Sequence, residues 1–270
     1  MKFLHLLIEA TKLWFRKGAE QYAAALSYFI PFALAPLLLI SITLVGVIIG
    51  RQDVIALLKR WGEMIDPALP EFMTMTIANF EVLTTTYTLP LFALLFFSVM
   101  ILFALNSLSS GLQKLWEVER FGAKNLFWRS GRSILFVLLF QVYLVITILS
   151  NNFFLNATET SGLTLFTVLA QVMFFISTTL LIALGFGLLP LTAPSFKARL
   201  YGAVVATTLF LFTRTLVALH VATSPSPDIY GAAGLIFILL IWVYISACII
   251  YYGASFAYVY EKQSKKTATK

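Results

Sequence analysis

Arg214 is the only charged residue inside the long apolar runs of this sequence, and it is the side chain best suited to chemistry. At the centre of a membrane helix an Arg costs roughly 2.5–3.5 kcal/mol on insertion scales, so such a charge indicates function by default. Its planar fork of donors fits a phosphate or a carboxylate. Two interpretations stay open. Arg214 binds an anionic substrate, or its long side chain snorkels to lipid headgroups near the end of its run.

A second set of candidate residues lies in the first two apolar runs. Pro31 and Pro36 each remove a backbone hydrogen bond and bend a helix, and broken helices line substrate sites in transporters. Ser27 and Tyr28 precede the prolines, and Asn106 lies near the end of the second run. We expect these residues to line a shared internal cavity that binds the substrate. The alternatives are interhelical hydrogen bonding for the polar side chains and ordinary packing for the prolines.

These candidates are held by apolar runs long enough to cross a membrane. The hydrocarbon core is about 30 Å thick, so a spanning helix needs roughly 20 mostly apolar residues. The chain is 60% hydrophobic and 11% charged, whereas soluble domains are about 25% charged. We predict an all-α, polytopic membrane helical bundle, one domain over residues 1–262 with a basic disordered tail over 263–270. Its six transmembrane helices are expected at about 23–49, 89–112, 133–154, 163–189, 201–221 and 231–252.

Two regions outside the runs have amphipathic patterns. The segment Met1–Glu20 places most of its apolar residues, Trp14 among them, on one helical face, which predicts an interfacial helix. An anchor for the first span is favoured over a gate or a lipid-sensing flap. The segment Arg51–Thr88 repeats apolar residues at helical spacing on both sides of Pro67 and Pro70, which predicts two short interfacial helices on the outer surface.

The basic residues predict the orientation of the chain. With the N-terminus inside, the inner segments hold 15 of the 19 Lys and Arg residues, and the outer segments hold only Arg51, Lys59 and Arg60. Cationic loops resist transfer across the membrane, so both termini are expected in the cytoplasm. The net charge of +7 is explained by the anionic cytoplasmic leaflet, and no nucleic-acid partner is expected.

The sequence also argues against several kinds of chemistry. Cys248, His5 and His220 are too few and too scattered for a Cys/His metal site, and no cofactor is expected. Paired acids or histidines typical of a membrane transferase are missing, so we expect no enzymatic activity. A Gly-rich nucleotide-binding motif is also missing, which excludes ATP-driven transport by this chain alone.

Three blocks of sequence carry a resemblance to a known family. They are Ala25–Phe29 leading to Pro36–Leu39, then Leu112–Val118, and a closing block of Ile229–Gly234, Trp242–Tyr244 and Gly253-Ala254. Together they resemble the YihY/BrkB family of bacterial inner-membrane proteins over nearly the whole chain. The family has been tied to serum resistance and envelope upkeep, and it once carried a ribonuclease label that no clustered His/Asp/Glu set here supports. Ser255 stands where the family usually has Glu, so no mechanism that needs this Glu is carried over.

The resemblance implies six spans with cytoplasmic termini in the bacterial inner membrane. We expect a protein that moves or accommodates an amphipathic, lipid-like anionic substrate in envelope homeostasis, with membrane lipids as its partners. The alternative is a non-transporting scaffold or assembly factor. Arg214 would attract the head of the substrate, and the first span would line its path.

The charge bias yields a direct test of topology. In a Cys248→Ser background, Lys124→Cys in the loop after the second run should react with a thiol reagent only when the reagent reaches the cytoplasm. Modification from the periplasmic side alone would overturn the predicted orientation.

Overall fold

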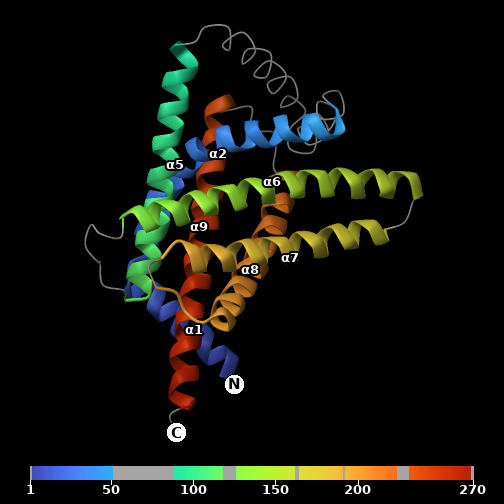
Figure 1. Cartoon of the computed structure of the whole chain (residues 1–270). Coiled ribbons are helices and arrows are strands. Elements are labelled where there is room, and N and C mark those ends of the chain that lie inside the picture. The colour runs from blue at the N-terminus through green and yellow to red at the C-terminus, as the bar shows by residue number, and fades with distance from the viewer. Residues whose placement is uncertain are drawn as a thin grey trace. The chain divides into compact units, whose positions relative to one another are not determined.

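The computed structural model describes residues 2–50, 88–117, 126–161, 164–190, 192–223 and 231–268. Within them every regular element is an α-helix, which confirms the predicted fold class. Figure 1 shows α1 (Lys2–Arg16), α2 (Ala19–Ile49), α5 (Thr88–Leu115), α6 (Leu126–Ser161), α7 (Leu165–Leu188), α8 (Phe196–Thr223) and α9 (Gly231–Ala268). The two helices predicted on the outer surface fall in 51–87, outside the described residues.

Five of the described helices contain a stretch long and apolar enough to cross a membrane. The stretches are Ala19–Ile49, Phe96–Leu115, Gly131–Thr158, Leu165–Leu188 and Leu240–Lys266. They confirm a helical membrane bundle. The remaining predicted span, 201–221, lies within α8 but is not among the five, so the count of six stays a prediction.

The described residues group into two compact units. The first contains Met1–Pro31, Leu102–Phe140 and Val172–Lys270, and the second contains Phe32–Ile101 and Gln141–Gln171. Helices α2, α5, α6 and α7 contribute residues to both units. In the second unit, Gln141 of α6 donates from Nε2 to Ser41 Oγ of α2 at 2.7 Å, next to a small apolar cluster around Val45 and Ile148.

The first unit is built around the contact of α8 with α9. A Cβ added at Gly202 would lie 2.4 Å from the carbonyl oxygen of Gly253, and one added at Gly253 would lie 2.6 Å from that of Gly202. The backbones therefore touch, as small residues allow in membrane helices. Around this contact the side chains of Ala203, Ala206, Ala254 and Ala257 are buried.

Helix α9 also binds α5 through buried side chains. Tyr251 is fully buried, its ring fills the space left by Gly111, and its hydroxyl donates to the Ser107 carbonyl at 3.1 Å. Trp116 donates from Nε1 to the Ala254 carbonyl at 2.9 Å. These bonds satisfy polar groups that would be costly in a membrane without partners.

The end of α9 corrects one expectation. The sequence predicts disorder from Gln263 onward, but the helix continues to Ala268, so that prediction is wrong over Gln263–Ala268. Lys265 Nζ lies 2.9 Å from Glu261 Oε1 one turn earlier, and Gln263 Nε2 lies 3.3 Å from His5 Nδ1 of α1. Ion pairs at this spacing and basic residues in the last turn both stabilise a helix.

The backbone contact predicts a strong effect of a single methyl group. Gly202→Ala should separate α8 from α9 and destabilise the protein by about 1–3 kcal/mol, the usual cost of overpacking. The measurement is the midpoint of heat-induced loss of the monodisperse peak in size-exclusion chromatography. Gly131→Ala is the matched control, because a Cβ there meets nothing within 4 Å; in a helix this change is neutral or stabilising. Equal midpoints for both variants would contradict the close contact.

Candidate functional site

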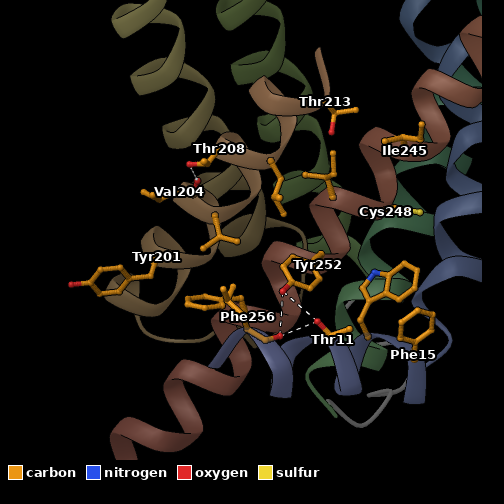
Figure 2. A pocket seen from close by; sticks show the side chains of 15 residues that line it. Thr11, Phe15, Tyr201, Val204, Thr208, Thr213, Ile245, Cys248, Tyr252 and Phe256 are labelled. Atoms are coloured by element: carbon orange, nitrogen blue, oxygen red, sulfur yellow. Dashed lines mark hydrogen bonds between the residues drawn. The ribbon is translucent and has the colours of Figure 1, made fainter. Parts of the chain in front are cut away.

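An apolar groove of about 740 Å³ lies between α1, α8 and α9 (Figure 2). Each helix contributes a stripe of side chains at spacings of about one turn. The lining comprises Leu7, Thr11, Trp14 and Phe15 of α1, Tyr201, Val204, Val205, Thr208, Leu209 and Thr213 of α8, and Ile245, Cys248, Ile249, Tyr252 and Phe256 of α9. Most small-molecule sites are similarly concave and apolar with a few polar groups.

Three hydroxyl groups of the groove bond to the protein backbone. Thr11 donates to the Leu7 carbonyl at 2.9 Å, and the Tyr252 hydroxyl donates to the same carbonyl at 3.2 Å (Figure 2). Thr208 donates to the Val204 carbonyl at 2.8 Å. Because these hydroxyl groups already bond to the backbone, the groove presents mostly hydrocarbon. That surface fits an acyl chain better than a sugar or a nucleotide.

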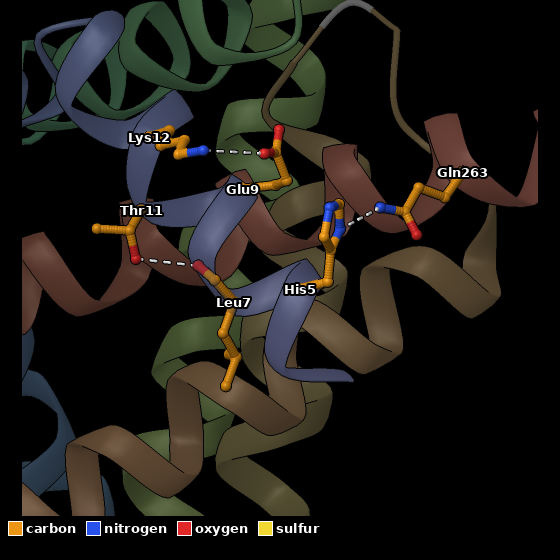
Figure 3. Close-up of polar contacts among 6 residues, drawn as sticks. All are labelled: His5, Leu7, Glu9, Thr11, Lys12 and Gln263. Carbon is orange, nitrogen blue, oxygen red and sulfur yellow. Dashed lines mark hydrogen bonds and ion pairs between the residues drawn. The ribbon is translucent and has the colours of Figure 1, made fainter. Parts of the chain in front are cut away.

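Helix α1 is fixed to α9 as one wall of the groove. Leu6 and Ala10 are buried against Phe256. His5 lies against Gln263, while the Glu9–Lys12 pair stays on the exposed side of α1 (Figure 3). This packing favours the anchor interpretation of the N-terminal helix over a free gate.

Helix α1 also has exposed apolar side chains. Leu4 and Ile8 are exposed, and Phe15 is largely exposed although it lines the groove. Exposed apolar side chains on an amphipathic helix are typical of an interfacial location.

None of the groove residues was among the site residues predicted from the sequence. Sequence reasoning placed Trp14 on the apolar face of the N-terminal helix, but it gave that face an anchoring role. The structure adds that Trp14 Nε1 is buried without a hydrogen-bond partner among the described residues. The apolar face of α1 could be recognised in the sequence. The side chains of α9 that contact α1 lie more than 240 residues further along the chain, and no sequence pattern paired them with it.

The predicted site residues of the first two spans do not line this groove. Ser27 is buried, and its hydroxyl donates to the Ala24 carbonyl of its own helix at 2.8 Å. Tyr28 is exposed and packs edge-to-face on Phe29, with ring centroids 5.2 Å apart. Asn106 is exposed on α5. The shared cavity stays a prediction.

The two prolines lie within a helix that is continuous. The assignment of α2 runs unbroken from Ala19 to Ile49 through both Pro31 and Pro36. Pro31 ends the part of α2 that belongs to the first compact unit, and Pro36 lies in the second unit. Neither proline lines the groove, so their role in lining a substrate path stays a prediction.

Arg214 lies on a different side of α8 from the groove. Its guanidinium carbon is 5.3 Å from the ring centroid of Phe174 on α7. Thr207, two turns earlier, shares a hydrogen bond of 3.1 Å with Thr179 of α7, so this face of α8 is directed toward α7. Arg214 is exposed, and a cation–π contact at an exposed site contributes about 0.5–1 kcal/mol. Both interpretations of Arg214, substrate binding and snorkelling, remain open.

A charged cluster joins α9 to the ends of α1 and α5. Lys17 Nζ donates to Glu117 Oε1 at 2.7 Å, and the Tyr258 hydroxyl donates to Oε2 at 2.9 Å. The hydrogen bond from Lys17 is the main cause that lowers the pKa of Glu117 below its ordinary value of 4.5. Glu117 has a φ of 54°, a strained backbone conformation for a residue other than glycine, which persists when the surrounding contacts hold it.

The fold and the groove together define a class: a helical membrane protein with an apolar groove among three of its helices. Within that class the family can be stated. The pattern of the family described as virulence factor BrkB matches residues 12–270, so the chain belongs to that family. The resemblance drawn from the sequence blocks is confirmed.

Related proteins agree with this assignment. A UPF0761 membrane protein of Alcanivorax borkumensis is 25% identical over 241 residues, covering 88% of this chain and 56% of the relative. A UPF0761 membrane protein of Coxiella burnetii is 26% identical over 252 residues, which cover 88% of this chain and 86% of the relative. A UPF0761 membrane protein of Chlorobium luteolum is 28% identical over 180 residues, which cover 64% of this chain and 41% of the relative. The chain thus spans about half the length of the Alcanivorax and Chlorobium relatives. No solved structure matches it.

The Glu117 cluster predicts a pH dependence of stability. A carboxyl group whose pKa is lowered by folding stabilises the protein above its unfolded pKa, and this contribution is lost as the pH falls through the folded pKa. We expect the heat stability of the wild type to decline below about pH 4.5, with part of this decline missing in Glu117→Gln. Glu9→Gln, which removes an exposed carboxylate from a pair within α1, is the control. Identical pH profiles of Glu117→Gln and the wild type would contradict the role of the cluster.

Proposed function

We propose that this protein accommodates the acyl chain of an amphipathic, lipid-like anionic substrate in the groove of α1, α8 and α9, in service of envelope homeostasis. The groove is the observation that carries the proposal, because its walls are mostly hydrocarbon and the hydroxyl groups of Thr11, Thr208 and Tyr252 donate to backbone carbonyls. In a membrane, lipids are the abundant molecules with matching chemistry. The proposal leaves the role non-enzymatic.

The proposed setting is the bacterial inner membrane, with both termini in the cytoplasm. The support is that 15 of the 19 Lys and Arg residues lie in the predicted inner segments, which are the N-terminal part up to Lys17, the stretch from the end of α5 to the start of α6, the start of α8 and the end of the chain from Lys262 onward. The exposed apolar residues of α1 fit a helix that lies at the membrane interface. The proposed partners are membrane lipids rather than nucleic acid.

An apolar groove alone cannot select one lipid over others. Hydrocarbon gains little when it moves from the bilayer into an apolar groove, because lipid tails are as apolar as Leu. Selection for an anionic molecule therefore needs a basic residue near its head. Arg214 is the candidate that the sequence supplies, but it lies over Phe174 on a different side of α8, so an anionic head at Arg214 and an acyl chain in the groove would have to reach around that helix.

Filling the groove tests the proposal. Thr208→Trp places an indole between the walls, so a phospholipid with a photoreactive diazirine on its acyl chain should no longer label peptides of α1 and α9. Complementation of an envelope-sensitivity phenotype should fail in the same variant at normal protein abundance.

Thr215→Trp is the matched control. Thr215 is also an exposed threonine of α8 bonded to the carbonyl four residues earlier, at 3.0 Å, and it does not line the groove. The lipid should label this variant as it labels the wild type, and the variant should complement the envelope-sensitivity phenotype. If the lipid labels the Thr208→Trp variant as well as the wild type, and the variant complements as well, the groove has no role in lipid binding. The scaffold alternative then replaces the proposed function.

A further inference from the structure

Two guanidinium groups meet at the last turn of α7. Arg132, near the start of α6, donates from Nη2 to the carbonyl oxygen of Gly187. Arg199, in the first turn of α8, lies against the same glycine, because a Cβ added there would be 1.8 Å from Arg199 Nη1. Three helices thus bring two positive charges to one residue that has no side chain.

Capping of α7 explains one of these arginines but not both. The exposed carbonyls at the end of a helix are equivalent to a charge of about −0.5. Arg132 alone outweighs that charge, and it already satisfies the Gly187 carbonyl. The second guanidinium therefore leaves a surplus of positive charge at this helix end.

The protein itself does not neutralise this surplus within its described part. The ion pairs found there are Lys12–Glu9, Lys17–Glu117 and Lys265–Glu261, and none involves Arg132 or Arg199. Arg199 Nε is buried without an acceptor among the described residues. Its guanidinium does contact the ring of Phe196 at 5.6 Å, but a ring face carries no full negative charge. Like charges this close are unfavourable unless an anion lies with them.

The position of the pair relative to the spans indicates what the anion is. Arg132 is the second residue of the apolar stretch Gly131–Thr158, and Gly187 is the second last residue of Leu165–Leu188. Both arginines are therefore located where an apolar stretch ends, at the depth at which lipid phosphates lie.

We propose that Arg132 and Arg199 form a phosphate-binding site at the end of α7. Two planar forks of N–H donors match the oxygens of a phosphate group. The phosphate comes either from the headgroup of an anionic lipid or from the aqueous phase. The site is separate from the groove, because α6 and α7 form no part of the groove lining.

The test compares a lipid that carries a phosphate with a lipid that lacks one, and with phosphate alone. Full-length protein in detergent is titrated with phosphatidylglycerol, with diacylglycerol of the same chains, and with inorganic phosphate, and bound lipid is counted by native mass spectrometry. Phosphatidylglycerol should bind more tightly than diacylglycerol. Arg132→Lys and Arg199→Lys should each weaken its binding about tenfold, as expected for the loss of a charge-assisted hydrogen bond.

Gly187→Ala is the sharper variant, since it keeps both charges. Its methyl group must displace the mobile end of Arg199, so it should weaken phosphatidylglycerol binding with little loss of stability. Arg16→Lys, at an exposed arginine at the end of α1, is the control and should bind as the wild type does.

The outcomes separate the two sources of phosphate and the two sites. Competition by inorganic phosphate, with no preference for phosphatidylglycerol over diacylglycerol, assigns the site to free phosphate. A preference that millimolar phosphate leaves intact assigns it to a lipid headgroup. Equal binding of all ligands, or the same affinities in Gly187→Ala, Arg199→Lys and Arg16→Lys, overturns the proposal. Thr208→Trp should leave the headgroup preference unchanged, so failure of the groove and failure of this site can be told apart.

Discussion

The backbone contact of Gly202 with Gly253 is the constraint on which the first compact unit depends. Inside a membrane, burial of apolar surface does not drive helices together, so close van der Waals packing must do so. The contact fixes α9 against α8, and α9 in turn binds α5 through Tyr251 and Trp116 and binds α1 through Phe256. A shift of α9 would disturb all of these contacts together.

The groove and the charged ends follow from the same arrangement. Glycine and alanine bring α8 and α9 together along one face, whereas the adjoining face carries larger side chains such as Tyr201, Ile249 and Tyr252. Those side chains and α1 leave an open apolar volume. Two groups of charged side chains lie at helix ends, where Glu117 meets Lys17 and where Arg132 and Arg199 meet Gly187.

Most of the helices could be predicted from the sequence, because apolar runs of membrane length have one stable conformation in lipid. The end of α9 could not, since Gln263–Ala268 is polar and its helix gains contacts with Glu261 and His5 that only the fold brings close. Arg214 was identifiable as an outlier, but its neighbour Phe174 was not. The groove was missed for the same reason: periodicity shows which face of a helix is apolar, but not which distant helix lies beside it.

The distribution of carboxylates bears on how any movement of a lipid would be driven. The six apolar runs contain no Asp or Glu. The structure begins α2 at Ala19, so Glu20 falls in its first turn, where the helix dipole stabilises a negative charge. Proton relays across a membrane use chains of acidic residues or histidines, and one carboxylate at the end of a helix makes no such chain. For the proposed movement of an amphipathic molecule, this distribution favours movement down the gradient of that molecule, or movement driven by a partner protein, over coupling to protons.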